Sequence, residues 1–144
     1  MSMTVEEALK QATFYSDDQL YVFLKLPSRA ITAAAGVVAE ISEPFCALIV
    51  DKDEVSLLIP EEALEDFKGR LRDYQGENKR YRLITVDIEL PMEMVGFMAR
   101  LSQKLAEAGV SILPYAAYSR DHIVIEDKHF DNAMQALRAL QSEI

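Results

Sequence analysis

The stretch Ile112–Met134, ILPYAAYSRDHIVIEDKHFDNAM, decides the fold. Two apolar runs flank Ser119–Asp121, which predicts a β-hairpin with a charged tip. Residues 128–141 follow, with Phe130, Met134 and Leu137 at the spacing of one helix face. A hairpin followed directly by a helix is therefore predicted here.

The stretch Phe45–Phe67, FCALIVDKDEVSLLIPEEALEDF, has the same order. Its two apolar runs flank Asp51–Glu54, and Pro60 is followed by two glutamates. Acidic residues in the first turn complement a helix dipole, so we expect a helix over residues 61–74. The two stretches predict a structural repeat.

A strand and a helix precede each hairpin. Residues 20–26 alternate apolar and other side chains, and residues 81–90 have one clearly apolar face, so both predict strands. Residues 30–42 favour a helix despite Gly36. Residues 93–109 predict a stronger helix, with an apolar stripe and Gly109 at a left-handed C-cap. A short helix over residues 5–12 is predicted before the repeat.

Each half is one strand short of the ferredoxin-like βαββαβ unit. We expect the strand after residues 75–80 to complete the first half and the strand from Tyr21 to complete the second. The predicted fold class is α+β, with two repeats, antiparallel sheets and helices packed on one face. The first repeat is expected over residues 1–74, the connector over 75–79 and the second repeat over 80–144.

Composition excludes several functions. The formal charge of −9 argues against nucleic acid, and the longest apolar runs are shorter than the roughly 20 residues of a membrane-spanning helix. Because no signal peptide is visible at the start, the expected location is cytoplasmic. The lone cysteine, Cys46, is interpreted as a buried hydrophobe.

Motifs for catalysis are absent from the sequence. There is no Gly-rich phosphate loop, no G-x-S-x-G and no HExxH. With His122 and His129 as the only histidines, a metal site lacks ligands. We therefore expect no enzyme activity, no cofactor and no metal.

Residues 94–140 closely resemble the C-terminal repeat of small tandem ACT-domain proteins, including the ACT modules of the CASTOR arginine sensors. The resemblance lies in Gly96, in LAEAG at residues 105–109, and in a hairpin with an aspartate before IVI at residues 123–125. Residues 43–64 resemble the degenerate N-terminal repeat of the same family. The resemblance implies a non-catalytic regulatory module that binds an amino acid at the interface between repeats, and a homodimer.

The resemblance also implies a ligand site. A helix N-terminus offers unpaired N–H groups to a carboxylate, and a glycine lets the ligand approach the backbone. Asp121 would meet a cationic group of the ligand. The implied ligand-binding residues are Met94, Val95, Gly96, Ala117, Tyr118 and Asp121.

Other interpretations stay open. Gly96 also fits a helix over which a strand packs closely, and Asp121 also fits a turn. His122 fits an ion pair with Asp121 or a pH-sensitive contact. For the whole chain the alternative is a structural or dimerisation module without a ligand. A regulatory subunit of an amino-acid-metabolism enzyme is one form of this alternative.

Overall fold

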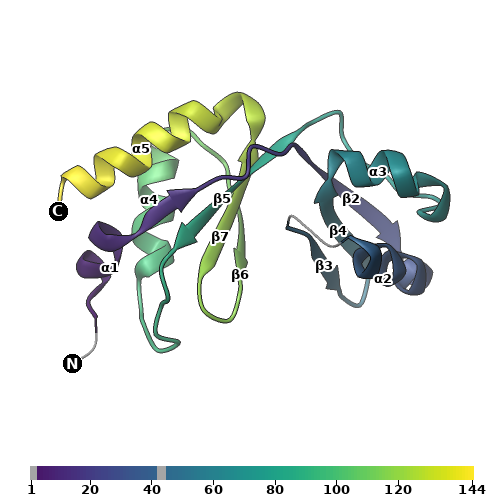
Figure 1. The fold of residues 1–144 in the computed structure, drawn as a ribbon, viewed down its shortest axis with the longest axis horizontal. Helices are drawn as coiled ribbons and strands as arrows, with labels where there is room; N and C mark the ends of the chain where they lie inside the picture. The colour runs from purple at the N-terminus through teal and green to yellow at the C-terminus, as the bar shows by residue number, and fades with distance from the viewer. Residues whose placement is uncertain (1–2, 42–44) are drawn as a thin grey trace. The chain divides into compact units, whose positions relative to one another are not determined.

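The chain forms two compact units in the computed structural model, which describes residues 3–41 and 45–144. Unit 1 contains residues 1–18 and 82–144, and unit 2 contains residues 19–81. Both combine antiparallel strand pairs with helices, so the predicted α+β class is confirmed (Figure 1). In the described part of the chain, no helix is long and apolar enough to cross a membrane.

Unit 1 contains the second predicted repeat. Its elements are α1 (Val5–Gln11), β1 (Thr13–Tyr15), β5 (Tyr81–Asp87), α4 (Phe97–Glu107), β6 (Leu113–Ala116), β7 (Asp121–Glu126), a 3-10 turn η3 (Asp127–His129) and α5 (Phe130–Ser142). Its strands follow the order β1-β5-β7-β6, which is the ferredoxin-like order with β1 as the added strand. Helices α4 and α5 pack together over the sheet (Figure 1).

The strand that completes unit 1 differs from the prediction. The fourth strand is β1, whose residues Thr13, Phe14 and Tyr15 pair antiparallel with Asp87, Val86 and Thr85. The strand from Tyr21 does not fill this place. All seven of its residues pair with β4, from Tyr21 opposite Pro60 to Pro27 opposite Glu54.

Unit 2 contains the first predicted repeat. Its elements are β2 (Tyr21–Pro27), the 3-10 turn η1 (Ser28–Ala30), α2 (Ile31–Glu40), β3 (Ala47–Val50), β4 (Glu54–Pro60), α3 (Glu61–Phe67) and the 3-10 turn η2 (Lys68–Arg70). The predicted helix over residues 30–42 is thus α2, and Ser42 lies outside the described residues. The predicted helix over residues 61–74 ends early, because the backbone tightens into η2 around Gly69.

The segment that follows α3 runs along β2. Lys25 and Gln75 exchange two backbone hydrogen bonds of 2.8 Å, and Tyr21 pairs with Tyr81. The strand after residue 80 was expected to complete this half, but residues 82–87 belong to unit 1. The division therefore differs from the predicted one in two places, at residues 1–18 and at residues 80–81.

The N-terminal segment joins unit 1 because Ala8, Leu9 and Ala12 are buried in the core of that unit. Ala8 and Leu9 of α1 are fully buried with residues of β5, α4, β7 and α5. Gln141 of α5 donates hydrogen bonds to the carbonyls of Leu9 at 2.9 Å and Ala12 at 2.8 Å. A capping box between Thr4 and Glu7 starts α1. Local sequence patterns do not contain these long-range contacts.

Replacing Leu9 by Ala should lower the free energy of unfolding by about 2–5 kcal/mol, because it leaves a cavity in the core of unit 1. Lys10 is the matched control. It is exposed on the same helix, so Lys10→Ala should change stability by about 0.5 kcal/mol or less. Denaturant unfolding of both variants measures the difference. Equal effects would contradict the burial of α1 in unit 1.

Candidate functional site

Unit 1 contains a pocket of about 360 Å³. This volume lies within the range of small-molecule sites. Its walls are the loop of residues 88–96 after β5, the first turn of α4, and the tip of the β6–β7 hairpin. The lining residues are Leu90, Pro91, Met92, Met94, Gly96, Phe97, Met98, Ala99, Ala116, Ala117, Tyr118, Ser119, Arg120 and Asp121.

The structure brings together most of the residues that the sequence implied. Met94, Gly96, Ala117, Tyr118 and Asp121 all line this pocket. Val95 does not line it and is 87% exposed. The expected site lay between the two repeats, whereas every residue that lines this pocket belongs to unit 1.

Gly96 sets where α4 begins. Its backbone is left-handed, with φ of 94° and ψ of 0°, and it is the N-cap residue. The predicted helix start at residue 93 is therefore wrong, since a left-handed residue cannot continue a right-handed helix. The alternative that a strand packs closely over Gly96 is also wrong, because a Cβ atom there would have no neighbour within 4 Å. The glycine is explained by its positive φ.

The first turn of α4 faces the pocket without a side-chain cap. Gly96 has no side chain to accept the N–H groups of that turn. Phe97, Met98 and Ala99 of the same turn line the pocket. Free N–H groups and the positive end of an eleven-residue helix favour an anionic group nearby.

The tip of the hairpin comprises residues 117–120. Ala117 N donates to Arg120 O at 3.0 Å, and Asp121 pairs with Ala116 as the first residue of β7. Asp121 therefore lies in the strand pair and not in the turn. Leu90 N donates to Ser119 O at 2.7 Å, which joins the loop of residues 88–96 to the tip. This hydrogen bond holds two walls of the pocket together.

Asp121 is a partly buried carboxylate in the pocket wall. It makes no hydrogen bond or ion pair with any side chain in residues 3–41 and 45–144. Burial raises the pKa of this carboxyl above its ordinary value, and the neighbouring His122 lowers it by a smaller amount. A partly buried carboxylate without a hydrogen-bonded side chain is available to a cationic group of a ligand.

Arg120 and His122, which flank Asp121, have other contacts. Arg120 Nη1 lies 2.9 Å from Asp87 Oδ1, in a pair whose side chains are 36% and 50% exposed. His122 Nδ1 lies 2.9 Å from the buried Thr85 Oγ1. Burial lowers the pKa of His122, Asp121 raises it, and Arg120 lowers it. Thr85 could not be found from sequence, because it is 37 residues away on another strand.

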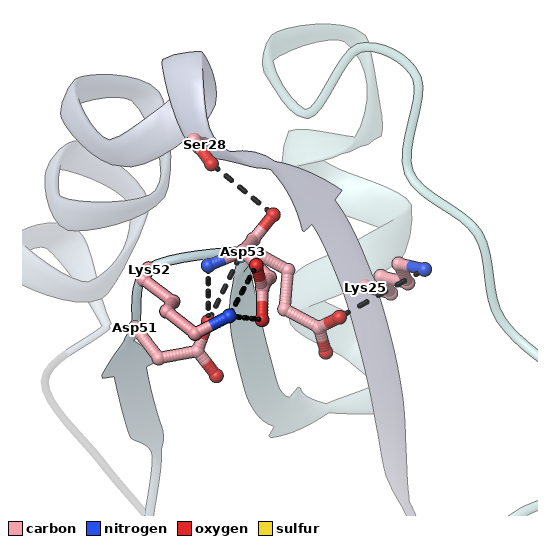
Figure 2. Close-up of polar contacts among 6 residues, drawn as sticks. Lys25, Ser28, Asp51, Lys52 and Asp53 are labelled. Carbon is pink, nitrogen blue, oxygen red and sulfur yellow. Dashed lines mark hydrogen bonds and ion pairs between the residues drawn. The ribbon is translucent and has the colours of Figure 1, made fainter.

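At the corresponding place in unit 2, a hydrogen bond joins the hairpin tip to the residue after the first strand. Figure 2 shows the tip of the β3–β4 hairpin against the start of η1, where Ser28 Oγ donates to Asp53 O at 3.2 Å. The Asp51 carboxylate accepts from Asp53 N at 2.8 Å and Glu54 N at 2.9 Å, which lowers its pKa. Ser28 directly follows β2, whereas residues 88–96 separate β5 from α4. The longer connection leaves the space for the pocket in unit 1.

A smaller pocket of about 190 Å³ lies elsewhere in unit 2. Its polar lining includes Arg29, whose Nη2 is 2.7 Å from Asp73 Oδ2. Both side chains are more than half exposed, so the pair contributes at most about 1 kcal/mol. No uncompensated buried charge was found there among the described lining residues, and the pocket of unit 1 is the stronger candidate.

The C-terminal segment of the chain is similar to a known family. Residues 77–139 match the ACT domain family model. The ACT segment covers β5 to most of α5, which is the region of the pocket. The 144 residues fit two ACT-like repeats of ferredoxin-like topology. A search of curated proteins finds no match to this chain.

Several solved structures share the fold of the whole chain. A Vibrio cholerae protein of unknown function, described as a possible transport protein, has a TM-score of 0.70 and 25% identity over 96% of each chain. The structure of aspartokinase α and β subunits has a TM-score of 0.67 and 16% identity, over 90% of this chain and 97% of that chain. The ligand-free regulatory subunit of aspartate kinase from Thermus thermophilus has a TM-score of 0.59 and 16% identity, also over 90% of this chain and 97% of that chain. At 16% identity the likeness establishes the fold alone.

Substitution of Gly96 tests whether its left-handed backbone is required. Gly96→Ala should lower the free energy of unfolding by about 1–2 kcal/mol, because a Cβ atom is strained at this φ although the space is open. Gly96→Asn is the matched control and should cost less, since asparagine tolerates this conformation. Thermal unfolding compares them. A neutral alanine variant would contradict the stated role of Gly96.

The raised pKa of Asp121 predicts a pH effect on stability. Because the folded-state pKa lies above the unfolded value, the native state binds more protons between the two. Stability of the wild type should therefore fall, relative to Asp121→Asn, as pH rises from the ordinary aspartate pKa through the raised one. Denaturant unfolding of both proteins at a series of pH values measures this difference. A difference that stays constant with pH would contradict the desolvation of Asp121.

Proposed function

We propose that the chain is a non-catalytic regulatory module that binds an amino acid in the pocket of unit 1. Asp121 carries the proposal, as a partly buried carboxylate in the pocket wall that makes no side-chain hydrogen bond among the described residues. It lies in the same pocket as the uncapped first turn of α4. An amino acid has both an ammonium group for Asp121 and a carboxylate for the helix N-terminus.

The ligand-binding residues in this proposal are Met94, Gly96, Ala117, Tyr118 and Asp121. Gly96 lets the ligand approach the backbone closely because no atom occupies the place of its missing Cβ. Tyr118 is 83% exposed and forms the outer wall. Val95 is left out of the set, because it does not line the pocket.

The regulatory part of the proposal is supported by the ACT segment and by the fold shared with aspartate kinase regulatory subunits. We propose that ligand binding changes the behaviour of a separate protein. An enzyme of amino-acid metabolism is the proposed partner, and the chain acts as a homodimer. The finer likeness to arginine sensors would make arginine the ligand.

One observation favours the alternative of an interaction module without a ligand. Three large apolar side chains are exposed around the pocket: Met92 at 72%, Val95 at 87% and Tyr118 at 83%. Exposed apolar groups close together are typical of protein interfaces. In this alternative a second protein chain covers the pocket.

A thermal-shift screen against the twenty amino acids tests the proposal. A ligand at a hundredfold excess over its Kd should stabilise the chain by about 2.7 kcal/mol and raise Tm by roughly 5–10 °C. The shift should vanish in Asp121→Asn. Asp131→Asn is the matched control, because Asp131 is exposed on α5 and does not line the pocket.

Retention of the shift in Asp131→Asn would show that losing an acidic group elsewhere is harmless. A shift that survives Asp121→Asn would remove the proposed site. No shift with any amino acid would support the alternative, and sedimentation with candidate partners would follow.

A further inference from the structure

We infer that the pocket of unit 1 selects amino acids with an uncharged apolar side chain over lysine and arginine. The inference rests on the proposed function, since it names the side-chain class for that site. Its evidence is the number and position of the charged side chains in the pocket wall, and the apolar side chains that form the rest of the wall.

The wall has a single carboxylate. Among the described residues that line the pocket, only Asp121 carries a negative charge. The α-ammonium group of any amino acid requires one anionic partner, and Asp121 supplies it. A lysine or arginine brings a second cation, for which the wall offers no second carboxylate. A buried charge without a partner is unfavourable.

The wall also carries a positive charge. Arg120 lines the pocket beside Asp121, with its guanidinium 2.9 Å from Asp87. Asp87 itself does not line the pocket, so its carboxylate pairs with Arg120 and does not contact a ligand. A cationic side chain in the pocket would therefore gain no attraction from this ion pair. The ligand carboxylate, in contrast, is favoured both by Arg120 and by the N-terminus of α4.

The remaining wall suits an apolar group. Leu90, Pro91, Met94, Phe97 and Met98 line the pocket from the loop and from α4. Phe97 is buried in the core of unit 1, and Met94 and Met98 pack against that core, so this part of the wall is held in place. Methionine is flexible and polarisable, and it contacts aliphatic, thioether and aromatic groups equally well. The side chain of the ligand is thus placed against this wall.

Norleucine and lysine form a suitable pair of probes, since they share a linear carbon chain and differ by the terminal ammonium group. Calorimetric titration of the full chain should give a Kd for norleucine at least about tenfold below that for lysine, a difference of about 1.4 kcal/mol. Methionine should bind like norleucine, and arginine like lysine. Binding of norleucine should be lost in Asp121→Asn.

A second pair of variants tests the charge argument directly. Ala117→Asp adds a carboxylate to an exposed position in the wall, and Ala117→Asn adds a group of the same size without charge. The aspartate variant should lower the ratio of lysine Kd to norleucine Kd at least about threefold relative to the asparagine variant. Equal ratios in the two variants would overturn the charge argument.

The outcomes separate the inference from the proposed function. Lysine or arginine binding as tightly as norleucine, with both lost in Asp121→Asn, would overturn the inference and uphold the amino-acid site. No binding of any of the four amino acids to the wild type would overturn the inference, whereas the proposed function falls only if none of the twenty amino acids shifts Tm. Preferential norleucine binding that is lost in Asp121→Asn supports both.

Discussion

The left-handed backbone of Gly96 is the constraint on which the candidate site depends. Because its φ is 94°, α4 begins at Phe97, and residues 88–96 form a separate connection after β5. The hydrogen bond from Leu90 N to Ser119 O then fixes this connection to the hairpin tip. The pocket, the uncapped first turn of α4 and the place of Asp121 in the wall all follow from these two features.

The two units differ in the length of the connection between the first strand and the first helix of the repeat. In unit 2, η1 follows β2 directly, and Ser28 forms a hydrogen bond to Asp53 in the hairpin tip. Asp51 of that tip is exposed and accepts two backbone hydrogen bonds, so its charge is stabilised within its own turn. Asp121 in unit 1 lacks such partners among the described residues and is partly buried. The same supersecondary unit therefore carries a closed turn in one repeat and an open pocket in the other.

Sequence periodicity predicted most elements, because the alternation of apolar side chains is a local property. The hairpin before α5, the helix α2 and the strands β2, β4, β5 and β7 are confirmed on this basis. Periodicity could not identify β1 as the partner of β5, since strand pairing depends on contacts between residues distant in the chain. Nor could it place Leu9 in the core of unit 1.

For the site, the resemblance led to the glycine, the hairpin and the aspartate, and five of the six implied residues line one pocket. It could not give the backbone conformation of Gly96, which excludes residues 94–96 from the helix. Met94 and Met98 pack against the core of unit 1 and also line the pocket. Both contacts depend on the path of residues 88–96, which the helical spacing of these methionines does not predict.

Amide chemical-shift mapping by NMR tests the central claim most directly, since a chain of 16.2 kDa gives resolved spectra. Titration with norleucine should shift amide signals in two segments, residues 90–99 and residues 116–121, with Met98 and Ala99 at the start of α4 among the largest changes. The signals around Lys25 and Gln75, beside the smaller pocket of unit 2, should stay unchanged. Changes confined to unit 2, or no changes at saturating ligand, would contradict an amino-acid site in unit 1.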